Sequence, residues 1–231
     1  MRRIRAVSLD AISTVAEAFA SELERVVFVG GTVTALYPLE DGVDVRPTTD
    51  VDCVVDVATA ADYYAFANKL RKLGFRERTE EGAPNCRFVV RDVRVDVVAT
   101  ADTAIGPTNR WYKAAVAAAE VHPLGALKVR AIAPIYFVAT KLEAFRGRGA
   151  GDYQASHDLE DLLLVIAGLG SLRDEIYTAA SEVARAVRSE LAELRKIDAF
   201  VDSVAGHFDG DYAGQVRADR ILAWIKALPP L

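Results

Sequence analysis

The chain has 231 residues, of which 52% are hydrophobic and 26% charged; this composition excludes a disordered chain and is enough for one or two domains. Its formal net charge of −5 argues against sequence-blind binding along nucleic acid, which needs a basic surface, but is compatible with contact to an RNA end. Two cysteines exclude a disulfide framework and predict buried free thiols, and three scattered histidines give no zinc-type spacing. Without a signal-peptide pattern or an apolar run of about 18 residues, we expect a soluble cytoplasmic protein with no membrane contact.

The first part of the chain predicts a helix followed by two strands. In chain order we expect a helix over residues 9–23, a strand over 26–29, a helical turn over 32–37, a polar loop over 39–49 and a strand over 50–57. Pro38 stops the helical turn. The first strand ends directly at Gly30-Gly31, a pair that suits a tight turn.

The middle of the chain predicts a helix and further strands. In chain order we expect a helix over residues 61–73, strands over 86–91 and 93–100, irregular structure over 101–117, and an extended piece that ends near residue 132. Gly74 provides the C-terminal signal of the helix. The two strands are separated by Asp92 alone, which indicates a hairpin without the preferred Asn-Gly turn.

From Pro134 the pattern becomes helical. We expect helices over residues 135–145, 172–194, 198–208 and 212–228, with a glycine-rich link after the first. Ser171, with Asp174 three residues later, predicts a capping box at the start of the longest helix. The predicted fold class is therefore α+β: a mixed sheet flanked by helices in residues 1–130, followed by a helical bundle in residues 131–231.

Two aspartates one residue apart, Asp50 and Asp52, open the second predicted strand. Because side chains alternate faces along a strand, both carboxylates point the same way, roughly 7 Å apart along the backbone. Carboxylates this close repel each other unless a cation neutralises them, and a hard divalent cation with oxygen ligands is suited to that task. The Gly30-Gly31 turn offers backbone N–H groups that can receive phosphate. Together these features suggest nucleotide chemistry.

The order of these motifs resembles the DNA polymerase β-like nucleotidyltransferase superfamily. The resemblance is carried by Gly30-Gly31-Thr32, by Arg46-x-Thr48-x-Asp50-x-Asp52 and by an isolated acid, Asp96, on a later strand. A second signature is similar to that of the AbiEii-type nucleotidyltransferase toxins: Lys141-Leu142-x-Ala144-Phe145 followed by Asp158-Leu159-x-Asp161-Leu162. The spacing between Thr32 and Asp50 is longer than is usual for the superfamily.

The resemblance implies a role for each matching residue. Asp50, Asp52 and Asp96 would bind Mg²⁺ or Mn²⁺, and Asp96 alternatively takes the proton of the acceptor hydroxyl. The residues implied to bind the NTP substrate are Gly30, Gly31, Thr32, Arg46 and Lys141, with Lys141 directed at the β- and γ-phosphates. Asp158 or Asp161 would orient Lys141 or position the acceptor.

The resemblance to AbiEii-type toxins implies an enzyme that transfers NMP from an NTP to RNA, such as a tRNA 3′ end, and that is paired with a cognate antitoxin protein. One alternative is transfer to a small hydroxylated molecule such as an aminoglycoside. Another is a catalytically inactive nucleotide-binding module. The aromatic and basic run 110–113 either stacks on a base or anchors its own loop.

Overall fold

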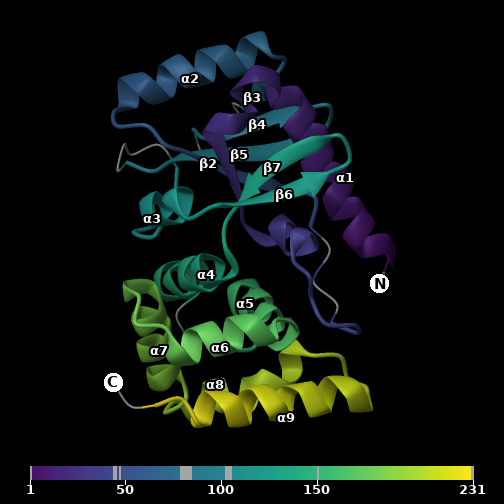
Figure 1. The fold of residues 1–231 in the computed structure, drawn as a ribbon, viewed down its shortest axis with the longest axis vertical. Coiled ribbons are helices and arrows are strands. Elements are labelled where there is room, and N and C mark those ends of the chain that lie inside the picture. Colours follow the sequence, from purple (N-terminus) through teal and green to yellow (C-terminus); the bar gives the residue numbers. More distant parts are fainter. Residues whose placement is uncertain are drawn as a thin grey trace. The chain divides into compact units, whose positions relative to one another are not determined.

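The computed structural model describes residues 2–43, 46, 48–78, 85–101, 106–149 and 151–229. It contains a sheet unit, Met1–Tyr37 with Arg46–Ala133, and a helical unit, Pro38–Val45 with Pro134–Leu231 (Figure 1). The mixed sheet with helices and the all-helical second unit confirm the predicted α+β class. The segment Pro38–Val45 belongs to the helical unit, although the predicted division was a single one between residues 130 and 131.

The described residues form one seven-stranded sheet with the order β3-β4-β5-β2-β1-β7-β6. The strands are β1 (Val26–Val29), β2 (Val51–Val55), β3 (Arg76–Glu77), β4 (Arg87–Val90), β5 (Val93–Ala99), β6 (Glu120–Leu124) and β7 (Leu127–Ala131). The pairs β1–β7 and β2–β5 are parallel and the other neighbours are antiparallel. The parallel pair β2–β5 therefore sets the two acid-bearing strands side by side.

The two faces of the sheet differ in character. One face is fully apolar in its centre, where Phe28, Cys53 and Val97 have no exposed surface, and α1 (Arg2–Phe19) and α2 (Ala60–Lys72) cover it. Because side chains alternate along each strand, the residues between these, including Asp52 and Asp96, point to the other face. Figure 1 shows α2 and α3 (Tyr112–Ala117) on opposite sides of this sheet. The core thus supports the sheet from one side and leaves the acids on the other.

Two predictions for the sheet unit need correction. The first helix begins at Arg2 rather than residue 9 and ends at Phe19, where the chain tightens into a 3₁₀ helix, Ala20–Arg25. The positive φ of 48° at Ala20 marks this change, which apolar spacing alone does not reveal. The stretch 101–117 is not wholly irregular, because Trp111 is buried and α3 follows it.

The β4–β5 and β6–β7 hairpins turn through residues with positive φ. Arg91 and Asp92 have φ of 46° and 66° and join β4 to β5, which confirms the predicted hairpin and explains how it closes without Asn-Gly. The extended piece before Ile132 is in fact two strands, β6 and β7, with Gly125 at φ 60° between them. The single-piece prediction was wrong because Gly125 was not recognised as a turn.

The helical unit contains six α-helices among its described residues. They are α4 (Pro134–Arg148), α5 (His157–Gly168), α6 (Gly170–Thr178), α7 (Glu182–Leu194), α8 (Asp198–Ser203) and α9 (Tyr212–Lys226). The predicted long helix 172–194 is wrong: it is interrupted after Thr178, and Ser181 caps α7 by accepting a hydrogen bond from the Ala184 amide. The helix predicted over 198–208 is shorter, since a 3₁₀ turn, Val204–His207, follows α8.

The segment after Pro38 is fastened to the helical unit. Glu40 forms ion pairs with Arg173 of α6 (3.1 Å) and Arg220 of α9 (3.2 Å), and its amide donates to the Gly168 carbonyl (2.8 Å). The hydrogen bonds of the two arginines lower the pKa of Glu40 against the opposing effect of burial. The segment Pro38–Val45, which lies within the long spacing between Thr32 and Asp50, is thus part of the helical unit.

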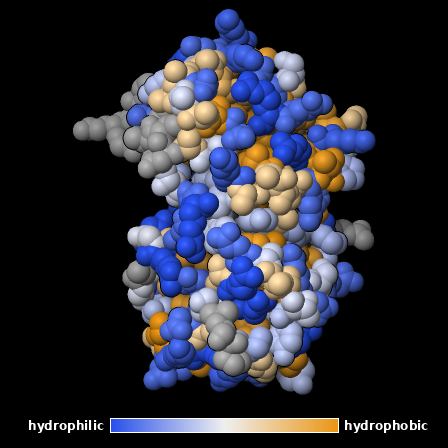
Figure 2. All heavy atoms as spheres, turned by 60° about the vertical axis from the view of Figure 1, so that its left-hand side comes forward, coloured by the Kyte–Doolittle hydropathy of each residue, from blue (hydrophilic) through white to orange (hydrophobic). Residues whose placement is uncertain are grey.

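Hydrophilic side chains dominate the face shown in Figure 2, with small hydrophobic patches between them. The large hydrophobic residues exposed in the described part are scattered along the chain: Val7, Tyr64, Val121, Tyr177, Ile197, Tyr212 and Val216. Among the helices that the structure describes, none has the length and apolar character needed to span a bilayer.

Candidate active site

The glycine turn and the second aspartate meet at the end of β1. Val29 pairs with Asp52 across the antiparallel β1–β2 ladder, and Gly30 follows immediately. Gly30 has φ 70° and ψ −170°, a backbone region that essentially only glycine occupies. A Cβ at this residue would lie 2.8 Å from Cγ and 2.9 Å from Cβ of Asp52, and closer still to Oδ2. The absent side chain of Gly30 is what leaves room for the Asp52 carboxylate.

Asp52 and Asp96 are direct partners in the parallel β2–β5 ladder. Their side chains therefore leave the sheet on the same face from strands about 4.8 Å apart. Both negative charges act on the buried thiols beneath them. After burial, the largest cause, they raise the pKa of Cys53, and burial together with Asp96 raises the pKa of Cys86 to about 11. The charges of the two acids thus act on the same pair of thiols. Both thiols are buried and free, as predicted.

Two arginines are bound to the acids. Arg87 of β4 donates from Nε to Oδ1 of Asp96 (2.8 Å) and from Nη2 to Oδ2 (2.7 Å), a bidentate ion pair. Arg94 of β5 donates to Oδ2 of Asp50 (2.7 Å). The Asp96 hydrogen bonds raise the pKa of Arg87, so this guanidinium stays charged. The carboxylates of Asp50 and Asp96 are thus each neutralised by a cation from the protein itself.

Asp52 and Asp96 could supply two ligands to a divalent cation, but they could not surround it. Among the described residues, no three His, Cys, Asp or Glu side chains come close enough to hold one ion. Mg²⁺ is usually held in nucleotide sites by one or two carboxylates, with substrate phosphates and water completing its shell. Asp52 and Asp96, facing each other across one ladder rung beside the side-chain-free Gly30, meet that requirement. Asp50 lies further out, half exposed and paired with Arg94.

The remaining residues of the sheet unit that were predicted to bind the NTP differ in their exposure. Thr32 is fully buried, and its hydroxyl has no hydrogen-bond partner in the described part of the chain. The Gly31 carbonyl accepts a hydrogen bond from the Thr34 hydroxyl (2.7 Å), which holds the start of the 3₁₀ helix Gly31–Leu36. Arg46 is half-buried ahead of β2. Among the residues predicted to bind the NTP, Gly30 is the one whose lack of a side chain directly makes room for an acid, Asp52.

Lys141 lies in the helical unit within a nearly closed ion network. Its Nζ donates to Asp161 Oδ2 (2.5 Å) and Asp158 Oδ1 (3.1 Å), while Arg148 donates twice to Asp158 at 3.0 Å. The Lys141 and Asp158 side chains are only 12% and 8% exposed. Burial lowers the pKa of Lys141, but the charges of Asp161 and Asp158 outweigh burial and raise it overall. Of the two roles predicted for these aspartates, this contact corresponds to orienting Lys141.

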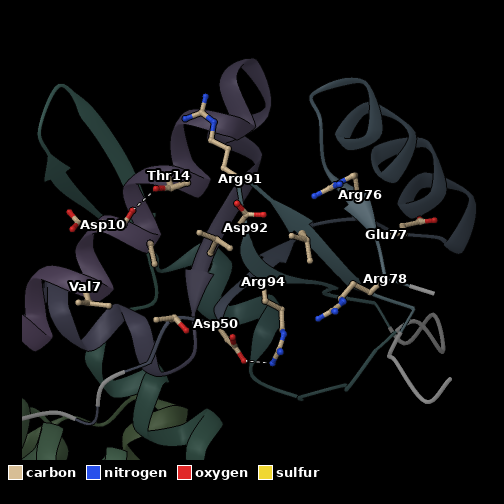
Figure 3. Close-up of a pocket in the computed structure, with 14 residues that line it drawn as sticks. Val7, Asp10, Thr14, Asp50, Arg76, Glu77, Arg78, Arg91, Asp92 and Arg94 are labelled. Atoms are coloured by element: carbon tan, nitrogen blue, oxygen red, sulfur yellow. Dashed lines mark hydrogen bonds and ion pairs between the residues drawn. The ribbon is translucent and has the colours of Figure 1, made fainter. Parts of the chain in front are cut away.

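An open pocket of about 900 Å³ lies beside Asp50 in the sheet unit. Figure 3 shows Asp50 and Arg94 directed toward each other at one end, with Asp10 and Thr14 of α1 across from them. Its charged lining consists of four arginines and four acids: Arg76, Arg78, Arg91, Arg94, Asp10, Asp50, Glu77 and Asp92. Arg91 is paired with Glu17 on the surface (2.8 Å). The pocket shares Asp50 with the candidate site, but Asp52 and Asp96 are outside its lining.

The run 110–113 serves as an anchor in this structure. Trp111 is buried, and the Arg110 guanidinium lies 4.8 Å from the centre of its ring. Of the two readings of this run, the buried position of Trp111 favours the anchor over an open base-stacking surface.

Sequence reasoning missed the basic partners of the acids, namely Arg87, Arg94 and Arg148. A usable signal existed for two of them. Arg94 stands two residues before Asp96 on one strand, and a two-residue turn at Arg91-Asp92 sets Arg87 opposite Asp96. Arg148, in contrast, reaches Asp158 only through the packing of α4 on α5.

The fold is nucleotidyltransferase-like. The chain is similar to the crystal structure of an antigenic nucleotidyltransferase-like protein from Paracoccidioides brasiliensis, with a TM-score of 0.52 and 18% sequence identity, over 85% of this chain and 92% of that one. No family model and no curated protein matches the sequence. The comparison therefore shows the fold alone.

Proposed function

We propose that this protein is a metal-dependent nucleotidyltransferase that transfers NMP from an NTP to an acceptor hydroxyl. The observation that carries the proposal is the meeting of three residues: Asp52 lies opposite Asp96 on one ladder rung, and the Asp52 carboxylate lies in the space left by Gly30. The nucleotidyltransferase-like fold supports the same reading.

Each group has a role in this proposal. Asp52 and Asp96, with Asp50 as a third carboxylate, would hold Mg²⁺ or Mn²⁺, and the metal would stabilise charge on the attacking and leaving oxygens. The Gly30-Gly31 backbone would lie against the triphosphate, where a side chain would obstruct it. Asp96 is an alternative acceptor for the hydroxyl proton. Thr32, Arg46 and Lys141 remain proposed contacts to the nucleotide, and Asp158 and Asp161 would act through Lys141.

The proposed acceptor is RNA, by the resemblance to AbiEii-type toxins, and a tRNA 3′ end is the specific candidate. The toxin role and the cognate antitoxin follow from that resemblance. A small acceptor such as an aminoglycoside, and loss of turnover altogether, are outcomes that the following experiment separates.

The test is to incubate the purified protein with each α-labelled NTP, Mg²⁺ or Mn²⁺, and either total RNA or an aminoglycoside. We expect label in RNA, and we expect Asp52→Asn and Asp96→Asn to abolish it. Asp56→Asn is the matched control, since Asp56 is exposed just after the same strand and its Oδ1 accepts a hydrogen bond from the Thr100 hydroxyl (2.7 Å). Label on the aminoglycoside alone would change the acceptor, and no label on either would reject the enzyme.

A further inference from the structure

Arg87 binds Asp96 through the same two oxygens that a metal ion would need. Its Nε and Nη2 lie 2.8 and 2.7 Å from the two carboxylate oxygens, so both are engaged. The pair is well shielded for a surface interaction, with side chains 27% and 20% exposed. A bidentate guanidinium–carboxylate pair is among the stronger ion pairs that proteins form.

The register of the sheet fixes this pair. Arg87 and Asp96 are direct partners in the β4–β5 ladder, and the turn at Arg91-Asp92 leaves no slack for a slip of the register. The arginine is therefore held beside the acid by backbone pairing rather than by a mobile loop. It also stands next to the Asp52–Asp96 rung, where two negative charges face each other.

We propose that Arg87 is a built-in counter-ion of the active site, which a divalent cation must displace from Asp96 before the site is loaded. The inference rests on the proposed function, because it takes Asp52 and Asp96 as the metal-binding pair. Without metal, the guanidinium offsets the repulsion between the two carboxylates. With metal, the cation takes over that task and Asp96 exchanges one positive partner for another.

Exchange of one cation for another has two opposite consequences for a variant that lacks the guanidinium. Replacing Arg87 by a neutral side chain removes the competitor, so the affinity of the site for a divalent cation rises. The same change removes the cation that is paired with Asp96, which lies beside Asp52, so the metal-free protein becomes less stable. A residue with a merely structural role would lower stability without raising metal affinity.

The experiment measures Mn²⁺ binding directly, by the electron paramagnetic resonance signal of free Mn²⁺, in the absence of nucleotide. We expect Arg87→Met to bind Mn²⁺ at least about fivefold more tightly than the natural protein, as the loss of one charged hydrogen-bonded competitor implies. Arg71→Met is the matched control, because Arg71 is paired with Glu77 on the surface, and its affinity should equal that of the natural protein. Equal or weaker binding by Arg87→Met overturns the proposal.

Two further measurements keep the test decisive. If Arg87→Met fails to fold without metal, Arg87→Lys is measured instead, because lysine retains the charge but cannot form the bidentate contact. Its Mn²⁺ affinity should be higher than that of the natural protein and lower than that expected for Arg87→Met. A Mn²⁺ affinity equal to that of the natural protein overturns the proposal. Asp52→Asn and Asp96→Asn separate the two levels of inference. If they leave Mn²⁺ binding intact, the metal site and hence the proposed function fail; if they abolish it while Arg87→Met does not tighten it, only the counter-ion role fails.

Discussion

The carboxylate of Asp52 occupies the space in which any residue other than glycine at position 30 would place its Cβ. Gly30 directly follows β1 and Asp52 lies on β2, the antiparallel neighbour of β1, so the pairing of Val29 with Asp52 brings the two residues together. The positive φ of Gly30 adds a second constraint at the same position. The turn and the acid are therefore parts of one steric arrangement, and a change in one displaces the other.

Gly30→Ala should destabilise the fold and disturb the acid pair. The backbone strain costs about 1–3 kcal/mol, and the collision with Asp52 adds to it. We expect a lower midpoint in urea unfolding and weaker Mn²⁺ binding than in the natural protein. The midpoint and the Mn²⁺ affinity can be measured on the same preparation.

Gly125→Ala is the control for that prediction. Gly125 also has a positive φ, 60°, but a Cβ there would meet nothing within 4 Å. The control should lose stability through strain alone and keep its Mn²⁺ affinity. Equal effects of the two substitutions on Mn²⁺ affinity would contradict the link between Gly30 and Asp52.

Local pattern was sufficient to predict much of the sheet unit. Four consecutive apolar residues gave β1, and the apolar runs on either side of Asp92 gave the β4–β5 hairpin. The parallel pairing of β2 with β5 was not readable in the same way. It depends on contacts between residues more than 40 positions apart, which set Asp52 against Asp96. The sequence therefore indicated the acids, and the fold determined which two of them face each other.

Charge partners and helix ends were harder to predict. A single helix was predicted over 172–194 because the apolar residues of α6 and α7 have the same helical spacing, and this spacing continues across residues 179–181. The break between the two helices therefore left no interruption in the apolar pattern. Lys141 was selected by resemblance alone, and its burial against Asp158 and Asp161 arises from the packing of α4 on α5. Such tertiary contacts leave no periodic signal in the sequence.

Ser181→Ala should destabilise the helical unit by about 1 kcal/mol, because the Ser181 hydroxyl accepts the Ala184 amide at the start of α7. Ser171→Ala is the comparison, since Ser171 lies inside α6, a helix whose start has no side-chain cap. Its exposed position predicts a change of at most about 0.5 kcal/mol. Thermal unfolding of the two variants measures the difference; a larger loss from Ser171→Ala would restore the originally predicted cap.

Asp92→Gly should stabilise the β4–β5 hairpin. Asp92 has φ 66° at the second position of a two-residue turn, where glycine carries no steric penalty. We expect a gain of about 0.5 kcal/mol in the free energy of unfolding. Asp92→Ala, which keeps the penalty and loses the polar side chain that tolerates this conformation, should instead reduce stability. Chemical unfolding of both variants provides the measurement, and a loss of stability on Asp92→Gly would contradict the assignment of the turn.

Asp158→Asn should cost about 3 kcal/mol at neutral pH, because it leaves Lys141 buried with only one of its two carboxylate partners. Burial raises the pKa of Asp158, but hydrogen bonds from Arg148 and the charge of Lys141 outweigh burial and lower it below the ordinary value of 3.8. A lowered folded-state pKa means that the stabilisation is present above that value and is lost as the pH falls below it. The difference between the variant and the natural protein should therefore be constant from pH 5 to pH 8 and shrink below about pH 4. Urea unfolding across this range measures it, with Glu193→Gln, from the exposed Lys196–Glu193 pair, as the control that should change little at any pH. A difference that stayed constant below pH 4 would mean that Asp158 acts through its shape and not through its charge.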